Sequence, residues 1–197
     1  MSLKYRPAEK ADSAKISELI NIASDGVVEY LFHDLVPEMT PVQIMAYNLE
    51  EDNYPHSYKS AVIATDGTNV VGMALSYLSS YHKITDEMRG FFPYERLEYL
   101  SDFYSAQVPD SWFLDALGVD DAYRMKGIGT RLVEFTKERA KDNGYGILSL
   151  IVFADNSPAL ALYKVLGFRV VKEINLEGNE FILQQDGCLL LKCDIAT

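Results

Sequence analysis

The sequence predicts an α/β (α+β) fold in which one mixed sheet is flanked by helices. Short apolar runs typical of strands alternate with amphipathic segments typical of helices. ILSLIVFA, residues 147–154, is the apolar run expected of a strand that is buried on both faces. The last part of the chain is rich in strand-forming segments. The length of 197 residues favours a single domain, 1–197, with room for a sizeable core.

Turn and capping residues divide residues 1–78 into a series of predicted elements. These are a strand at 3–8, a helix from 12 or 13 to 23, a second helix from 41 to 47, and a hairpin of strands at 60–65 and 69–78. Asp12 or Ser13 is a suitable cap for the first helix, and Gly26 follows that helix. Asp66 and Gly67 stand between two apolar runs, which is typical of a hairpin turn.

Residues 79–110 break this alternation, and we interpret them as an aromatic-rich helical insertion. Their aromatic residues include Tyr81, Phe91, Phe92, Tyr94, Tyr99, Phe103 and Tyr104. Pro93 at a first helical position, followed by Leu97, Leu100 and Tyr104, predicts one helix inside the segment. The insertion could wall a substrate pocket, cover a sheet edge or form a dimer contact. Burial within the monomer is the simplest expectation for its aromatic side chains.

Strands and helices alternate again after residue 110. The predicted elements are strands at 112–119 and 147–154, helices at 130–142 and from 157 to 166, a strand at 168–174, and a hairpin made from the two halves of 181–195. Asn143-Gly144 ends the first of these helices, Ser157-Pro158 opens the second, and Gly167 stops it. Asp186-Gly187 is the expected turn of the terminal hairpin.

The charge balance limits the possible partners. Lys and Arg number 18 and Asp and Glu 29, which gives a formal net charge of −11. An excess of acid argues against a broad surface for nucleic acid or anionic membranes. The apolar runs are shorter than a membrane span, and MSLKYRP at the start lacks the apolar core of a signal peptide. We therefore expect a cytoplasmic protein.

The cysteines and histidines indicate neither a disulfide nor a metal site. Cys188 and Cys193 have an odd spacing on one predicted strand, so their side chains should point to opposite faces. Free thiols fit a reducing cytosol. His33, His56 and His82 are scattered and have no ligand spacing, so we expect no metal.

RMKGIG, residues 124–129, is predicted to form an anion site between a strand and a helix. Gly127 and Gly129 permit a tight turn and a close approach of the backbone to a ligand. The first N–H groups of the following helix lack intrahelical partners, and the helix dipole favours negative charge there, which suits a pyrophosphate. A sharp turn with solvated cations is the simpler alternative. Neither a P-loop nor a dinucleotide fingerprint fits, because Thr130 follows Gly129 directly and Leu132 replaces a third glycine.

Three segments together resemble the GNAT superfamily of acyl-CoA-dependent N-acetyltransferases. They are the strand end LGVD at 117–120, RMKGIG at 124–129 and ADNSPALALYKVLGF at 154–168, and the resemblance covers about residues 112–168. It implies a GNAT-like fold with a mixed, mostly antiparallel central sheet, splayed central strands and flanking helices. It also implies acetyl-CoA as co-substrate. The insertion at 79–110 separates two strands that the family often joins by a shorter connection.

The resemblance implies a role for each matching residue. Main-chain groups at Leu117, Gly118 and Val119 would pair with the pantetheine arm. The pyrophosphate would be held by Arg124, Met125, Lys126, Gly127, Ile128, Gly129 and Thr130. Asn156 would anchor the cofactor arm, although it also suits a helix start. Tyr163 would protonate the leaving thiolate, although its spacing with Ala159, Leu162 and Leu166 is also typical of core packing.

Asp115 is the candidate general base. It is an acid inside the otherwise apolar strand WFLDALGV, where a carboxylate needs either a partner or a function. Its strand parity with Leu117 and Val119 suggests that all three face the acceptor side, while a salt-bridged structural role is equally compatible. Glu29, His33, Asp34 and Glu38, after the first helix, are further candidates.

These features predict transfer of the acetyl group of acetyl-CoA to a primary amine by direct attack in a ternary complex. The acceptor is expected to be a small-molecule or peptide amine, and a homodimer is possible. The alternative is a non-catalytic sensor or scaffold that binds acyl-CoA. Retention of both Tyr163 and a candidate base favours the enzyme.

Overall fold

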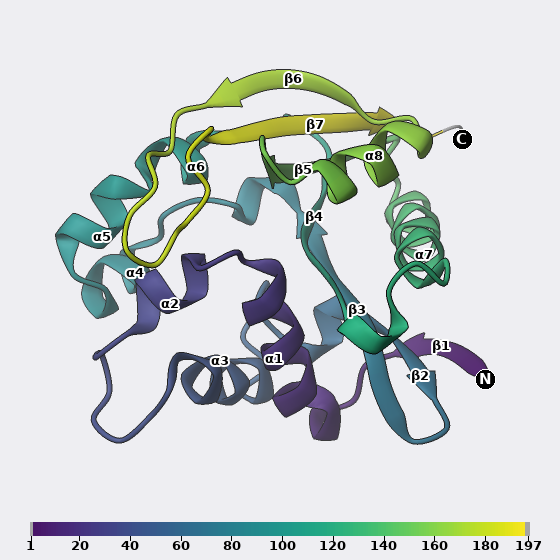
Figure 1. Ribbon diagram of the computed structural model, residues 1–197, viewed down its shortest axis with the longest axis horizontal. Helices are drawn as coiled ribbons and strands as arrows, with labels where there is room; N and C mark the ends of the chain where they lie inside the picture. The colour runs from purple at the N-terminus through teal and green to yellow at the C-terminus, as the bar shows by residue number, and fades with distance from the viewer. Residues whose placement is uncertain (1, 196–197) are drawn as a thin grey trace.

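Seven strands form one sheet in the order β1-β2-β3-β4-β5-β7-β6 in the computed structural model, which describes residues 2–195 (Figure 1). The strands are β1 (Leu3–Pro7), β2 (Ala61–Asp66), β3 (Asn69–Leu78), β4 (Trp112–Val119), β5 (Ile147–Phe153), β6 (Arg169–Ile174) and β7 (Cys188–Asp194). Only β4 and β5 are parallel neighbours, and the other pairs are antiparallel. The prediction of a mixed, mostly antiparallel sheet is confirmed.

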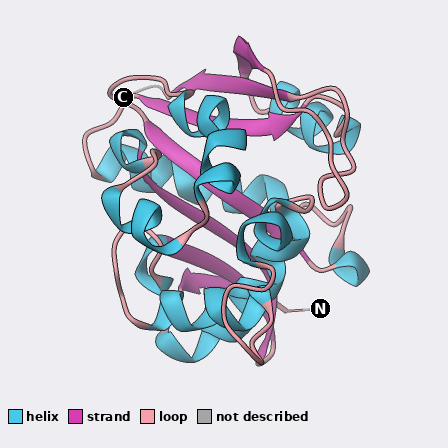
Figure 2. Ribbon diagram, turned by 90° about the vertical axis from the view of Figure 1, so that its left-hand side faces the viewer, coloured by secondary structure: helices cyan, strands magenta, loops and turns pink. Residues whose placement is uncertain are grey.

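Helices cover both faces of this sheet (Figures 1 and 2). They are α1 (Ser13–Ala23), α2 (Val27–Phe32), α3 (Pro41–Glu50), α4 (Asp86–Phe91), α5 (Tyr94–Tyr99), α6 (Ser101–Ser105), α7 (Ile128–Asp142) and α8 (Ser157–Val165). One buried apolar cluster joins α1, α2, α3 and the insertion to one face of the sheet. A second joins α7 and α8 to the other face. Alternate residues of the strands supply both clusters, as expected of a sheet covered on two sides.

The predicted hairpin of β2 and β3 and the helices α1, α3, α7 and α8 are present, with ends shifted by a few residues. Two short helical regions differ from the prediction. Val27–Phe32 forms α2, in a stretch with no predicted element, because Val28, Leu31 and Phe32 present one apolar face to the core. The insertion contains three short helices instead of one, because breaks after Phe91 and Tyr99 let each piece pack separately.

The prediction of a terminal hairpin within 181–195 is wrong. Gly187 does turn the chain with a positive φ of 70°, but β7 pairs with β5 and β6, and residues 175–187 contain no strand. Ile182 is fully buried and Leu176 is 3% exposed, both in the cluster that contains α2. The N–H groups of Phe181 and Ile182 donate to the Asn179 side chain instead of to a strand partner. Residues 175–187 therefore form a long loop beside α2 (Figure 1).

β4 and β5 separate after a short stretch of pairing. Their register covers only Trp112 to Leu114 on β4 and Leu148 to Leu150 on β5. On the other side of β4, Leu75 pairs with Ala116 and Ser76 with Leu114, so Asp115 is the extra residue of a β-bulge. A bulge bends its strand, which accounts for the direction that β4 takes away from β5. The predicted splayed central strands are confirmed.

Candidate active site

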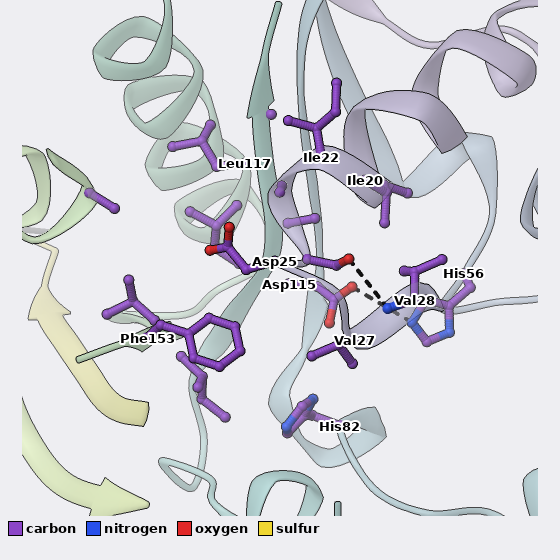
Figure 3. Close-up of a pocket in the computed structure, with 18 of the residues that line it drawn as sticks. Ile20, Ile22, Asp25, Val27, Val28, His56, His82, Asp115, Leu117 and Phe153 are labelled. Atoms are coloured by element: carbon purple, nitrogen blue, oxygen red, sulfur yellow. Dashed lines mark hydrogen bonds and ion pairs between the residues drawn. The ribbon is translucent and has the colours of Figure 1, made fainter. Parts of the chain in front are cut away.

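A cavity of about 1550 Å³ occupies the gap between β4 and β5. One part lies beside the N-terminal ends of α7 and α8, and the other lies between β4, α2 and the insertion. Figure 3 shows Asp115 in this cavity between Phe153 of β5 and His56 of the segment before β2. The cavity thus joins the predicted anion site to the candidate base.

The N-terminus of α7 opens into the first part of the cavity. Gly127 is the N-cap residue with φ 79°, and no side chain caps this end. Met125, with φ 59°, is also left-handed and fully exposed, a conformation that costs a non-glycine residue of order 1 kcal/mol or more. Uncapped N–H groups and the dipole of a 15-residue helix favour negative charge at this end.

The three glycines of this region serve different purposes. A Cβ on Gly127 would meet nothing within 4 Å, so its left-handed backbone is what requires glycine. A Cβ on Gly129 would lie 3.4 Å from Leu162 Cδ2 of α8, at the cavity wall. A Cβ on Gly118 would lie 2.6 Å from the Leu19 carbonyl oxygen, so this glycine lets α1 pack closely on β4.

The basic residues of the RMKGIG loop are only partly available to the cavity. Arg124 lines it, but its guanidinium also pairs with Asp121 at 2.7 Å. Lys126 is not among the lining residues, and its Nζ donates to the Ala122 carbonyl at 2.7 Å. Arg131 lies over the Phe135 ring at 4.3 Å and is likewise outside the lining. The other predicted cofactor residues all line the cavity, namely Leu117, Gly118, Val119, Met125, Gly127, Ile128, Gly129, Thr130 and Asn156.

Asn156 caps α8 and also reaches across the cavity. Its Oδ1 accepts from the Ala159 N–H at 3.2 Å, and its Nδ2 donates to Asp25 Oδ2 at 3.3 Å. Burial raises the pKa of Asp25, and the hydrogen bond from Asn156 only partly opposes this. Sequence reasoning missed Asp25, because Asp-Gly after a helix indicates only a turn.

Tyr163 packs in the core and also lines the cavity. Its ring packs against Phe168 at a centroid distance of 5.4 Å, and the residue is 7% exposed. It nevertheless lines the cavity, and burial raises its pKa, so the phenol stays protonated. Among residues 2–195 its ring contact is with Phe168, and its hydroxyl makes no hydrogen bond to another described residue. The hydroxyl proton is therefore available to a ligand.

Asp115 faces the α1–α2 side of the sheet, so the predicted shared parity with Leu117 and Val119 is wrong. Leu117 and Val119 pack in the cluster of α7 and α8, while Phe113 and Ala116 belong to the cluster of α1 and α2. The bulge at Asp115 shifts the alternation by one residue, a change that strand parity cannot anticipate.

Three side chains that sequence reasoning did not select surround Asp115. The Tyr77 hydroxyl donates to Oδ1 at 2.7 Å, and His56 Nε2 lies 3.7 Å from Oδ2. Burial acts to raise the pKa of Asp115, but contacts with His56 and Tyr77 and the nearby His82 outweigh it, so the pKa lies below its ordinary value. Asp115 is therefore ionised near neutral pH. No sequence signal marked these partners, because they come from separate segments.

The outlying candidates do not line the cavity. Glu29, His33, Asp34 and Glu38 are all absent from its lining. His33 instead contacts Arg96 Nη2 through Nε2 at 2.9 Å and stacks on Phe181. These two contacts link the end of α2 to the insertion and to the 175–187 loop.

Within residues 2–195, no group of His, Cys, Asp and Glu is placed to hold a metal ion. None of the helices in this range is long and apolar enough to cross a membrane.

Comparisons with known proteins agree with this geometry. The family model described as "Acetyltransferase (GNAT) family" matches residues 28–168. N-alpha-acetyltransferase RimI of Mycobacterium tuberculosis is 40% identical over 63 residues, which is 32% of this chain and 38% of that protein. Mycothiol acetyltransferase of Corynebacterium glutamicum is 36% identical over 64 residues, which is 32% of this chain and 22% of that protein. The matches thus span well under half of either relative.

A solved structure described as an acetyltransferase shares the fold over nearly the whole chain. The two superpose with a TM-score of 0.69 at 23% sequence identity, covering 98% of this chain and all of the other. At this level of identity the likeness shows the arrangement of strands and helices, including the seven-stranded sheet.

Proposed function

This chain belongs to the acetyltransferase (GNAT) family, and from that premise we propose that it transfers the acetyl group of acetyl-CoA to a primary amine. The observation that carries the proposal is one continuous cavity with an uncapped helix N-terminus at one end and an ionised carboxylate at the other. A non-catalytic binding module would need the uncapped helix N-terminus only.

The buried free thiols of Cys188 and Cys193 fit a reducing compartment such as the cytoplasm.

The residues around the gap fit acetyl-CoA. Its pyrophosphate would lie at the backbone N–H groups that begin α7, with Arg124 adding charge. Its pantetheine arm would enter between β4 and β5, where the main chain of β4 beyond Leu114 has no β5 partner. The substrate supplies an acetyl thioester. Unpaired N–H groups of β4 can donate to the thioester oxygen as negative charge develops on it.

Asp115 is proposed to bind and deprotonate the amine together with His56. Only ~0.1% of an alkylamine is neutral at pH 7, so the site must favour loss of a proton. A carboxylate with a lowered pKa attracts the ammonium strongly but is a weak base. His56 is half-exposed and lies 3.7 Å from Asp115 Oδ2, so it can pass the proton from Asp115 to solvent.

Tyr163 is proposed to donate a hydrogen bond to the leaving sulfur. The amine nitrogen forms the new bond to the acetyl carbon, the carbon–sulfur bond breaks, and the thiolate takes up a proton. Tyr163 lines the cavity and its hydroxyl remains protonated, which suits a donor at this step.

The proposal is tested by incubating the protein with acetyl-CoA and a panel of primary amines while free thiol is measured. Release of thiol that depends on the amine, with one acetylated amine formed per thiol, supports it. Binding of coenzyme A without transfer to any amine would favour the sensor and contradict the enzyme.

A further inference from the structure

We propose that the acceptor is a small primary amine that carries one bulky apolar group, with its nitrogen held between Asp115 and His82 Nδ1. This inference rests on the proposed acetyl transfer and specifies its acceptor. The acceptor part of the cavity is the part between β4, α2 and the insertion.

His82 presents an unused hydrogen-bond acceptor. The residue is 1% exposed, and desolvation lowers its pKa, so the ring is neutral. Its Nε2 lies 3.1 Å from the Phe103 carbonyl oxygen, and a carbonyl requires a donor, so the proton is on Nε2. Nδ1 therefore carries a lone pair, and it has no partner among the described residues. A buried acceptor of this kind is satisfied when a ligand donates to it.

Asp115 provides the second acceptor on the same side of the cavity. Its Oδ1 already accepts from Tyr77, while Oδ2 faces His56 at 3.7 Å, beyond hydrogen-bond distance. Figure 3 shows both Asp115 and His82 at this cavity, next to Val27 and Val28 of α2. A lone pair and a carboxylate together match the N–H groups and the charge of an ammonium.

Much of the rest of the acceptor part is apolar, and Asp86 and Glu87 of α4 also line the cavity. Its walls include Leu31 and Phe32 of α2, Met88 and Phe92 of the insertion, and Tyr104 of α6. Such walls favour an alkyl or aromatic group beside the amine.

The 175–187 loop packs over one side of the acceptor part. Phe181 stacks on His33, the residue after α2, at 4.2 Å, and the Tyr99 hydroxyl of α5 donates to the Glu177 carbonyl. Ile182 is fully buried, and Gln184 lines the cavity. Figure 1 shows this loop beside α2 and the insertion helices. A peptide crossing here would have to displace a packed segment.

Gly26 allows the close approach of this loop. It has φ 98°, and a Cβ at this position would overlap the Phe181 carbonyl oxygen. Gly26→Ala should therefore push the loop away from the α1–α2 turn. Gly67→Ala in the β2–β3 turn is the matched control, because Gly67 also has a positive φ, 62°, but its Cβ would meet nothing within 4 Å.

The first experiment compares 2-phenylethylamine and isoamylamine with ethanolamine, spermidine and a hexapeptide that begins with alanine. The kcat/KM for acetyl transfer should be at least ~10-fold higher for the two apolar amines. Equal or better transfer to ethanolamine, spermidine or the peptide overturns the inference.

Calorimetric binding of the same amines in the presence of coenzyme A separates this inference from the proposed function. Preferential binding of the apolar amines without transfer would refute the proposed reaction and support the acceptor class. Transfer that favours ethanolamine, spermidine or the peptide would support the proposed reaction and refute the acceptor class.

Two variants test the parts of the site. His82→Phe keeps an aromatic ring among Phe103 and Phe113 but removes Nδ1, so KM for 2-phenylethylamine should rise about tenfold while coenzyme A affinity is kept. Gly26→Ala, compared with Gly67→Ala, should raise the ratio of peptide to 2-phenylethylamine kcat/KM. An unchanged KM in His82→Phe refutes the role of Nδ1, and an unchanged ratio refutes the role of the loop. If His82→Phe does not fold, the amine panel decides alone.

Discussion

The Tyr77 hydroxyl on β3 donates a 2.7 Å hydrogen bond to Asp115 Oδ1 on β4, at the bulge where β4 turns away from β5. Tyr77 is 1% exposed, so this bond fixes the carboxylate in a buried position. It also determines which oxygen is anchored and which faces His56. The bulge that opens the gap between the strands thus also turns the candidate base into the cavity.

Asp115→Asn should reduce kcat/KM by about 10²–10⁴-fold, because the carboxylate attracts the ammonium and helps remove its proton. The pKa of Asp115 lies below its ordinary value near 3.8, so its own acid limb should fall below about pH 4. The loss in the variant should therefore be present at every pH from 5 to 9. The measurement is a pH profile of kcat/KM for both proteins.

Tyr77→Phe is the control for Asp115→Asn, because it removes the anchoring hydrogen bond but keeps the charge. Its effect on kcat/KM should be smaller. Full activity in Asp115→Asn over this pH range would place the base elsewhere.

His56→Gln should lower kcat with little change in melting temperature. The His56 side chain is 51% exposed, so little packing is lost, while the path for the proton from Asp115 is interrupted. Coenzyme A affinity, measured by calorimetry, should be unchanged because His56 is remote from the α7 N-terminus. An unaltered kcat would show that water alone carries the proton from Asp115.

Gly129→Val should abolish stabilisation by coenzyme A. At 100 times its Kd, a ligand adds about 2.7 kcal/mol to the free energy of unfolding, which corresponds to a Tm increase of about 5–10 °C for a chain of this size. A valine at 129 would extend past Leu162 into the space beside the first N–H groups of α7.

Gly146→Val is the matched control for this steric change, because Gly146 has no positive φ and a Cβ there would meet nothing within 4 Å. Its shift with coenzyme A should equal that of the unmodified protein, as followed by thermal denaturation. A full shift in Gly129→Val would argue against the pyrophosphate site.

Tyr163→Phe separates an acid role from core packing. The ring and its contact with Phe168 remain, so the melting temperature and coenzyme A affinity should change little. Loss of the hydroxyl should lower kcat by up to ~10²–10⁴-fold, with residual turnover from proximity and the β4 donors. An unchanged kcat would reject the acid role, and a large fall in melting temperature would indicate that Tyr163 mainly supports the core.

Asp12→Asn should destabilise the protein at pH 7 but much less at pH 3. Asp12 accepts from Arg6 at 2.7 Å and 3.0 Å and from the Glu9 N–H at 2.7 Å. Burial acts to raise its pKa, but these contacts lower it below 3.8. A depressed folded-state pKa contributes stability above the unfolded pKa, and that stability is lost as the pH falls through the folded value.

At pH 7 the variant should lose about 1.5–3 kcal/mol, or about 3–12 °C in Tm. Asp194→Asn is the control: its pair with Arg169 is as short, 2.7 Å, but both side chains are more than half exposed, so little should change. An equal loss in Asp12→Asn at both pH values would contradict the charged role of Asp12.

Local signals in the sequence predicted most of the elements. Gly127 and Gly129 after a strand indicated the turn into α7, and Ser157-Pro158 indicated the start of α8. Apolar runs identified β4 and β5, and apolar periodicity identified the core face of α8 that carries Tyr163. These features depend on backbone conformation and side-chain pattern within a few residues, and such information is contained in the sequence itself. The same local pattern supported the resemblance on which the cofactor assignment rests.

Only the tertiary structure decided where Asp115 points and what residues 175–187 cover. The face that Asp115 occupies depends on the register of β4 against β3, and one bulged residue reverses a prediction from strand parity. Its partners Tyr77, His56 and His82 come from segments that meet only after the sheet forms. Ile182 lies in a loop instead of the predicted hairpin, and there it is buried in the cluster that contains α2. Pairing and burial between distant segments are decided by competition across the whole chain, so short sequence patterns do not reveal them.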